Sequence, residues 1–186
     1  MTHGPIDINV DTLGDLRPIS KVVFSLGSNE GDSLTTLTQA VTYLADTPDL
    51  ILVDVSPVYQ TKPVGGVVQD DYLNVVVIAE STLEPLTLLD RALAIEDSFG
   101  RQRIITDGPR TLDIDLIMVG NRISEGELNL PHPRAHQRAF VLVPWYDVEP
   151  KAELPGHGPI ADLLVGLDRS VVSRRDDISI QRPSKQ

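Results

Sequence analysis

The chain has 186 residues, no cysteine and a formal net charge of -11 at pH 7. This length is typical of one domain that buries its own hydrophobic core. The lack of cysteine excludes disulfide frameworks and thiol chemistry and favours a reducing compartment, the cytoplasm. The negative charge argues against a nucleic-acid partner, because such binding needs a basic surface. No apolar stretch is long enough to span a membrane, so no membrane partner is expected.

The first 48 residues of the chain predict a tail, a strand and a helix. Residues 1–19 are polar without a sustained period, so we expect a flexible N-terminal tail. A single domain is expected over residues 20–168, beginning with a strand at 22–26 and a turn at 27–31. A helix then begins near Ser33 and ends before Pro48. Its apolar face is predicted to contain Leu34, Leu37, Ala40, Val41 and Leu44.

The following segments predict three more strands and a second helix. Strands are expected at 50–58 and 72–79, separated by a loop at 61–71. The second helix is expected from about Pro85 to Gly100, with Leu86, Leu89 and Leu93 on its inner face. An arginine-rich loop at 101–110 precedes a strand at 112–119. Loops and short helical pieces are expected to residue 168, and residues 169–186 are expected to form a weakly packed C-terminal tail.

This order of elements predicts the fold class. Strand, helix, strand, strand, helix, strand is the ferredoxin-like order, βαββαβ. We therefore expect an α+β fold, in which two helices pack on an antiparallel sheet and extra elements follow at the C-terminus.

Asp113 and Asp115 are the most informative polar residues, because they lie in an otherwise apolar strand. A strand places both carboxylates on one face, with Cα atoms about 6.5 to 7 Å apart. If buried, two like charges require protonation or a neutralising cation. Mg²⁺ binds one or two carboxylates together with water and phosphate oxygens, so this pair beside Arg110 suggests a nucleoside triphosphate. The alternative is an exposed strand face whose aspartates pair with arginines.

Arginines gather around this strand and favour a small anionic ligand. Six of them are Arg101, Arg103, Arg110, Arg122, Arg134 and Arg138. The chain has no Walker A loop and no dinucleotide fingerprint, so phosphates would be held by arginine side chains. We expect the loop between Gly100 and Gly108 to carry Arg101 and Arg103 over the bound nucleotide.

Two other groups of residues are candidates for binding. His132 precedes Arg134 and Arg138, although a histidine after a proline is more often a structural hydrogen-bond partner. Tyr72 and Asn74 are two apart on one strand and face the same way. An amide beside aromatic surface is suited to the polar edge of a flat heterocycle. Asn74 is equally suited to closing the neighbouring loop through its backbone.

Several motifs together resemble the 6-hydroxymethyl-7,8-dihydropterin pyrophosphokinase family over about residues 21–165. They are Gly27-Ser28-Asn29, Tyr59 with Thr61, Pro63 and Gly65, Asp71-Tyr72-Leu73-Asn74, Gly108 to Asp115, Pro131-His132, and Arg138 with Phe140. The resemblance implies an enzyme of folate biosynthesis. It would transfer the pyrophosphoryl group of ATP to the hydroxymethyl oxygen of the pterin and release AMP.

The resemblance also implies roles for individual residues. Asp113 and Asp115 would bind two Mg²⁺ ions that bridge the ATP phosphates. Catalytic arginines would be Arg101, Arg103 and Arg110, and the ATP-binding residues would be Glu96, Arg101, Arg110, His132 and Arg138. The pterin would contact Thr61, Val64, Gly65, Tyr72, Asn74 and Phe140, with Asn74 reading the ring edge and Phe140 stacking on its face. We expect a monomer whose partners are these two small-molecule substrates.

Two other functions remain compatible with the same residues. A metal-dependent hydrolase or nuclease would use Asp113 and Asp115 to activate water, but it would not need Tyr72, Asn74 and Phe140. A ferredoxin-like regulatory module would bind a small ligand, and the two aspartates would be dispensable for that binding.

Overall fold

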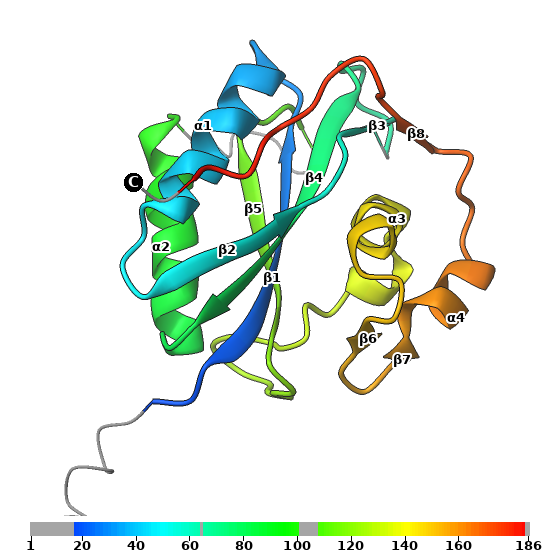
Figure 1. Cartoon of the computed structure of the whole chain (residues 1–186). Coiled ribbons are helices and arrows are strands. Elements are labelled where there is room, and N and C mark those ends of the chain that lie inside the picture. The colour runs from blue at the N-terminus through cyan, green and yellow to red at the C-terminus, as the bar shows by residue number, and fades with distance from the viewer. Residues whose placement is uncertain (1–16, 64, 101–107, 185–186) are drawn as a thin grey trace, which may run out of the picture.

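The computed structural model describes residues 17–63, 65–100 and 108–184. Thirteen elements lie within them (Figure 1): β1 (Ser20–Ser28), α1 (Ser33–Ala45), β2 (Leu50–Val55), β3 (Tyr59–Thr61), β4 (Tyr72–Ser81), α2 (Pro85–Ser98), β5 (Asp113–Val119), η2 (Ala135–Gln137), α3 (Ala139–Val148), β6 (Glu153–Leu154), β7 (Gly158–Pro159), α4 (Ile160–Val165) and β8 (Val172–Arg174).

The main sheet is antiparallel, with the strand order β5-β1-β4-β3-β8 and with β2 also paired to β4. β1 and β4 lie in its centre, and their long runs of buried residues are typical of strands covered on both faces. A bulge at Ile117 shifts the register between β5 and β1. The expected α+β architecture, an antiparallel sheet covered by helices, is confirmed.

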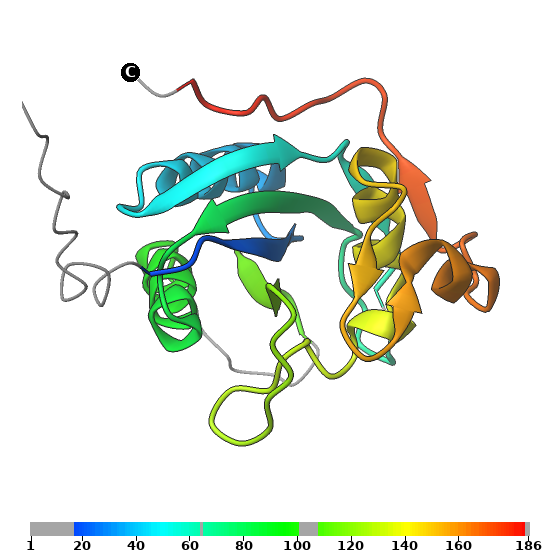
Figure 2. The ribbon, with the colours of Figure 1, turned by 60° about the horizontal axis from the view of Figure 1, so that its bottom comes forward.

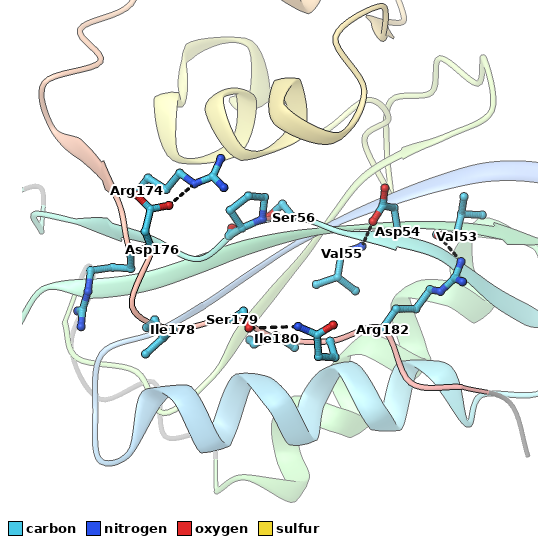
Figure 3. A pocket seen from close by; sticks show the side chains of 13 residues that line it. Val53, Asp54, Val55, Ser56, Arg174, Asp176, Ile178, Ser179, Ile180 and Arg182 are labelled. Atoms are coloured by element: carbon cyan, nitrogen blue, oxygen red, sulfur yellow. Dashed lines mark hydrogen bonds and ion pairs between the residues drawn. The ribbon is translucent and has the colours of Figure 1, made fainter.

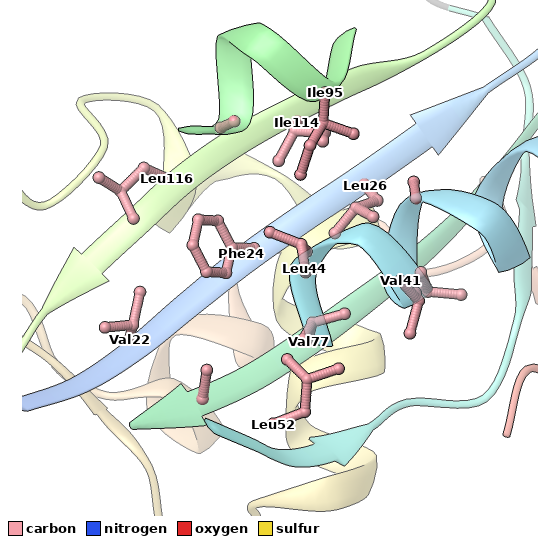
Figure 4. Close-up of a cluster of buried hydrophobic side chains, with 14 of the residues drawn as sticks. Val22, Phe24, Leu26, Val41, Leu44, Leu52, Val77, Ile95, Ile114 and Leu116 are labelled. Carbon is pink, nitrogen blue, oxygen red and sulfur yellow. The ribbon is translucent and has the colours of Figure 1, made fainter. Parts of the chain in front are cut away.

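Helices cover both faces of this sheet (Figure 1 and Figure 2). On one face, α1 and α2 pack on a large apolar cluster that includes Phe24, Leu26 and Leu44 (Figure 4). On the other face, α3 and α4 pack on a second cluster around Trp145, together with Val23 and Val76. The region expected to contain only loops and short helical pieces therefore includes α3, a helix of ten residues.

The apolar face of α1 is the one predicted. Leu37, Ala40, Val41 and Leu44 are fully buried, and Leu34 packs partly against the same cluster. The helix is capped by Asp32, the neighbour of Ser33, whose carboxylate accepts a hydrogen bond from the Thr35 N–H at 3.1 Å.

The predicted inner face of α2 is wrong for Leu86 and Leu93, whereas Leu89 packs partly against the large apolar cluster. Leu86 and Leu93 are 42% and 37% exposed, whereas the buried side chains are Leu88, Ala92, Ile95 and Glu96. The helix carries two apolar stripes at helical spacing, so the period alone does not choose between them. The buried stripe also contains Glu96, whose carboxylate accepts a hydrogen bond from the backbone of β5 and so has a partner inside the protein.

The C-terminal segment is packed at particular points. β8 pairs with the outer edge of β3, and Ile180 is 6% exposed within the large apolar cluster. The segment runs alongside β2 and α1 (Figure 2), and Arg182 donates to the Val53 carbonyl at 2.6 Å. Between β2 and this segment lies a groove of about 590 Å³ (Figure 3). Most other side chains after Asp168 are exposed.

Among the helices in the described parts of the chain, none is both long enough and apolar enough to cross a membrane.

We predict that Ile180→Ala lowers the free energy of unfolding by about 2 to 3 kcal/mol, because it removes buried apolar surface and leaves a cavity. Urea denaturation measures this difference. The matched control is Ile123→Ala, at a side chain that is 69% exposed. Equal effects of the two substitutions would contradict a core role for Ile180.

Candidate active site

The candidate site lies where the sheet face under α3 changes from apolar to polar. Along β1, the buried Val23 is followed on this face by Ser25 and Gly27. Along β4, Val76 is followed towards the same edge by Asn74, and Gly27 pairs with both Asn74 and Asp113. The apolar cluster therefore ends in a row of polar groups contributed by the three central strands.

Asp113 and Asp115 lie on this face of β5, as predicted. Ile114 between them packs into the opposite apolar cluster. Arg110 donates to Asp113 Oδ1 at 2.9 Å, and Arg138, immediately before α3, donates to Asp115 Oδ2 at 3.1 Å. The four side chains are 24% to 26% exposed, so each ion pair remains accessible to a ligand.

Burial and a second carboxylate both disfavour the charged form of Asp115. Burial and the neighbouring Asp113 carboxylate raise the pKa of Asp115 from 3.8 to about 6, although Arg138 and Arg110 oppose this shift. A bound cation would favour the charged form of Asp115. In the free protein, Arg110 and Arg138 supply only part of the positive charge needed to stabilise the ionised Asp115. The site therefore has room for an additional cation.

His132 lies beside this pair. Its Nε2 is 3.9 Å from Asp115 Oδ1, and its Nδ1 accepts a hydrogen bond from the Arg134 N–H at 3.2 Å. Burial, Arg138 and Arg134 lower the pKa of His132 to about 4, so the imidazole is neutral at pH 7. Because Nδ1 is an acceptor, the ring proton is on Nε2, where it can be donated to an anionic ligand.

Glu96 supports the aspartate strand from the opposite face. It is 1% exposed, and its Oε1 accepts a hydrogen bond from the Ile114 N–H at 2.7 Å. Ile114 separates the two aspartates, so this contact fixes the backbone that carries them. The structure thus gives Glu96 a positioning contact, and direct binding to ATP stays a prediction.

A second group of polar side chains is formed by β3 and β4. Asn74 Nδ2 donates to Thr61 Oγ1 at 2.7 Å, and both residues are buried. The Tyr72 hydroxyl donates to the Gly108 carbonyl at 3.0 Å, which links β4 to the chain before Arg110. Asn74 therefore bonds a neighbouring side chain, and its amide borders the row that leads to Asp113.

Gly27 allows this amide to reach the site. A Cβ atom on Gly27 would lie 2.9 Å from Asn74 Oδ1 and 3.7 Å from the Tyr72 ring. Tyr72 and Asn74 therefore face the same way, as predicted. Since Gly27 lies between Asn74 and Asp113, the backbones of these two residues are about 10 Å apart, or two strand spacings.

Asn29 joins two loops at the edge of the site, and sequence reasoning assigned it no role. Its Oδ1 accepts from the Arg110 N–H at 2.9 Å, and its N–H donates to the Arg110 carbonyl at 3.1 Å. Its Nδ2 donates to the Asp70 carbonyl at 2.9 Å and to Gln69 Oε1 at 3.0 Å. The only sequence signal was its place in the Gly27-Ser28-Asn29 turn.

Of the remaining predicted site residues, the structure describes only Gly65 and Phe140. Arg101, Arg103 and Val64 lie outside the described residues. Gly65 is exposed and has a φ of +105°, a conformation that favours glycine. Phe140 is the second residue of α3, and the Arg138 guanidinium lies 5.4 Å from the centre of its ring.

The donor set around Asp113 fits a hard cation that also binds a ligand. No group of three or more histidine, cysteine, aspartate or glutamate residues that could hold a metal occurs within the described ranges. Two adjacent carboxylates leave most of an octahedral shell to water and phosphate oxygens, which is the pattern of Mg²⁺ bound with a nucleotide. Together with the arginines, this arrangement is characteristic of an enzyme that acts on a phosphorylated substrate.

Comparison with known proteins defines the family. The family described as 7,8-dihydro-6-hydroxymethylpterin-pyrophosphokinase (HPPK) matches residues 23–150. The 2-amino-4-hydroxy-6-hydroxymethyldihydropteridine pyrophosphokinase of Mycobacterium bovis is 41% identical over 180 residues, covering 89% of this chain and 92% of that protein. The Mycobacterium leprae enzyme is 46% identical over 148 residues, covering 73% and 75%. The chain belongs to the HPPK family.

Solved structures support the same fold. A Plasmodium falciparum HPPK-DHPS triple mutant matches 80% of this chain with a TM-score of 0.63 and 13% identity. An HPPK-DHPS in complex with substrates matches 84% of this chain with a TM-score of 0.62 and 12% identity. The chain spans 43% and 46% of the length of these two structures.

We predict that Asp115→Asn stabilises the metal-free protein at pH 8 by about 2 kcal/mol. The raised pKa means that the folded state holds the Asp115 proton more tightly than the unfolded state does. Its stabilising contribution is complete below about pH 4 and is lost as the pH rises through about 6. Urea denaturation with EDTA from pH 4 to 8 measures it, with the exposed Asp90→Asn as control. Parallel pH profiles for wild type and Asp115→Asn would contradict the prediction.

Proposed function

We propose that this site transfers the pyrophosphoryl group of ATP to the hydroxymethyl oxygen of 6-hydroxymethyl-7,8-dihydropterin, a step of tetrahydrofolate biosynthesis. The observation that carries the proposal is the row formed by Asn74, Gly27 and Asp113 across three strands. It offers an amide for a heterocycle edge at one end and carboxylates for a metal-bound phosphate at the other. A distance of about 10 Å between them suits a substrate whose ring and reacting oxygen lie at opposite ends.

The reaction displaces AMP from the β-phosphorus. The hydroxymethyl oxygen forms a bond to that phosphorus, and the bond from the phosphorus to the α,β-bridging oxygen breaks. The electron pair leaves with AMP, and the hydroxyl proton is released. The protein must hold the oxygen in line with the bond that breaks, which is a positioning task.

Asp113 and Asp115 would hold Mg²⁺, and two ions are proposed. When bound, the ions neutralise charge on the phosphates and orient them for in-line displacement. The carboxylates would then no longer require Arg110 and Arg138 as their counter-charges. Both arginines would be free to donate to phosphate oxygens, for which a guanidinium has matching geometry.

The other nucleotide contacts follow from the same arrangement. His132 is neutral and would donate its Nε2 proton to a phosphate oxygen beside Asp115. Arg101 and Arg103 are proposed to close over the triphosphate from the loop that ends at Gly108. Glu96 would act on the nucleotide site through the Ile114 backbone.

The pterin would bind at the Asn74 end of the row. Asn74 and Thr61 present amide and hydroxyl groups to the ring edge, and Tyr72 forms the adjacent wall. Phe140 is proposed to stack on the ring, because a flat heterocycle gains most from contact with an aromatic face. Gly65 and Val64 would complete the site from the loop after β3.

We also propose the finer features of the molecule. The order β5-β1-β4-β2, with α1 and α2 on one face, supports a ferredoxin-like core. Residues 20–168 would be the pyrophosphokinase unit; most of the predicted N-terminal tail, residues 1–16, lies outside the described residues. The protein would act as a monomer in the cytoplasm.

A hydrolase or nuclease built on the same aspartates is less well supported. Such an enzyme would activate water and would have no use for an amide and an aromatic wall beside the metal site. Here Asn74 and Tyr72 border the strand position that pairs with Asp113. A regulatory module, in turn, would not require a carboxylate pair in which burial and the Asp113 charge raise the pKa of Asp115.

The first test of the proposal is metal dependence. We predict that Asp113→Ala and Asp115→Ala each reduce turnover at least about 10³-fold, since the phosphates lose their main source of charge stabilisation. Turnover is measured as AMP formed from ATP, Mg²⁺ and the pterin. Asp90→Asn is the matched surface control, and EDTA should abolish wild-type activity. ADP as product, or a variant with most of its activity, would overturn the assignment.

We predict that Gly27→Ala raises the KM for the pterin at least about tenfold, more than the KM for ATP. The added methyl group would displace the Asn74 amide, because its Cβ would lie 2.9 Å from Asn74 Oδ1. Steady-state kinetics with each substrate varied in turn separates the two effects. The control is Gly66→Ala, since a Cβ there would meet no atom within 4 Å. An equal loss for both substrates would count against Asn74 as a pterin contact.

A further inference from the structure

The proposed pterin contacts come from two elements that are distant in the chain. Thr61 ends β3, a strand of only three residues, and Phe140 is the second residue of α3. β3 pairs with β4 through the register Tyr59↔Asn74 and Thr61↔Tyr72, whereas α3 packs above this face of the sheet. Something must therefore fix the short strand relative to the helix if the ring is to fit between them.

Tyr59 provides a direct link between the two elements. It is 5% exposed, and its hydroxyl donates a hydrogen bond to Asp147 Oδ2 on α3. Tyr59 and Thr61 are two apart on one strand, so they share the face that Asn74 also uses. Burial and the Asp147 carboxylate raise the pKa of Tyr59 to about 12, so the hydroxyl remains a proton donor at any physiological pH.

The C-terminal strand β8 completes the link. It pairs with the outer edge of β3, where Arg174 is opposite Tyr59. Arg174 reaches towards α3 (Figure 3), and its Nη1 lies 3.3 Å from Asp147 Oδ2 while its Nε donates to Asp176 at 2.7 Å. The carboxylate of Asp147 thus accepts hydrogen bonds from Tyr59 on β3 and from Arg174 on β8. Arg174 lies beyond residues 23–150, the part that matches the HPPK family.

We propose that Tyr59, Asp147 and Arg174 form a positioning cluster through which the C-terminal strand β8 holds β3 against α3 and sets the width of the pterin site. This inference rests on the proposed pterin site. None of the three residues touches the reacting atoms. They act through Thr61 and Phe140, which the cluster keeps at a fixed separation. Strand β8 has a second function besides covering the edge of β3, which would otherwise be open to pairing.

The test compares substrate affinities in variants that remove single contacts. Tyr59→Phe deletes only the hydroxyl, and Arg174→Ala deletes an exposed side chain, so folding should be retained. Each should raise the KM for the pterin about threefold to tenfold, the equivalent of one hydrogen bond. The KM for ATP and kcat should stay within about twofold, because the aspartate end of the row does not depend on the cluster.

The matched control is Arg182→Ala. Arg182 belongs to the same C-terminal segment but bonds the Val53 carbonyl at the far end of the groove (Figure 3). This variant should lower Tm without changing the KM for the pterin. An equal rise in that KM for Arg182→Ala, or a lower Tm with unchanged KM for Tyr59→Phe and Arg174→Ala, would overturn the positioning role.

A further variant separates this inference from the proposed site. Asn74→Ala should raise the KM for the pterin more than any variant of the cluster. If Asn74→Ala has this effect and the cluster variants do not, only the inference fails. If Asn74→Ala also leaves the KM unchanged, the pterin site itself has been misplaced, and the cluster has no site to position.

Discussion

Asp113 and Asp115 share one face of a strand, and the repulsion between their carboxylates is the constraint on which the rest of the site depends. In the free protein Arg110 and Arg138 offset part of that repulsion, and burial still raises the pKa of Asp115 to about 6. The ionised Asp115 therefore lowers the free energy of unfolding of the free protein, and a bound cation would remove this cost. The arginines that stabilise the free site are the groups best suited to bind phosphate once a cation has replaced them. The free protein is thus less stable at the same residues that bind the ligand.

The sheet converts this local arrangement into a site for two substrates. Because β1 carries a glycine opposite both Asn74 and Asp113, one strand separates the amide from the carboxylates without a side chain between them. The apolar cluster below α3 ends at this row. The sheet face that stabilises the fold therefore also provides an apolar surface beside the binding site. Asn29 then joins the loops on either side, through Arg110 and Asp70. The geometry of the site is therefore set by strand register more than by loop conformation.

The sequence predicted the features that depend on the local spacing of apolar residues. It did not predict the features that depend on contacts between residues far apart in the chain. The order of β1, α1, β2, β4, α2 and β5, the buried face of α1 and the shared face of Asp113 and Asp115 all follow from spacing along the chain, whereas β3 and β8 were not predicted. The inner face of α2 did not, because two apolar stripes compete and the choice is made only when the helix packs on the sheet, where Glu96 accepts a hydrogen bond from the Ile114 N–H of β5. The hydrogen bond from Tyr59 to Asp147 joins residues that are 88 positions apart, so no local pattern predicts it. The same holds for Ile180, which is buried against residues from distant elements.

The most direct test of the central claim is a crystal structure with the pterin, Mg²⁺ and an ATP analogue whose α,β-bridging oxygen is replaced by a methylene group. We expect Arg110 and Arg138 to leave their aspartates and contact phosphate oxygens, with metal bound by Asp113 and Asp115 and with the pterin edge on Asn74. Intact arginine–aspartate pairs, with the nucleotide or the pterin bound elsewhere, would contradict the account.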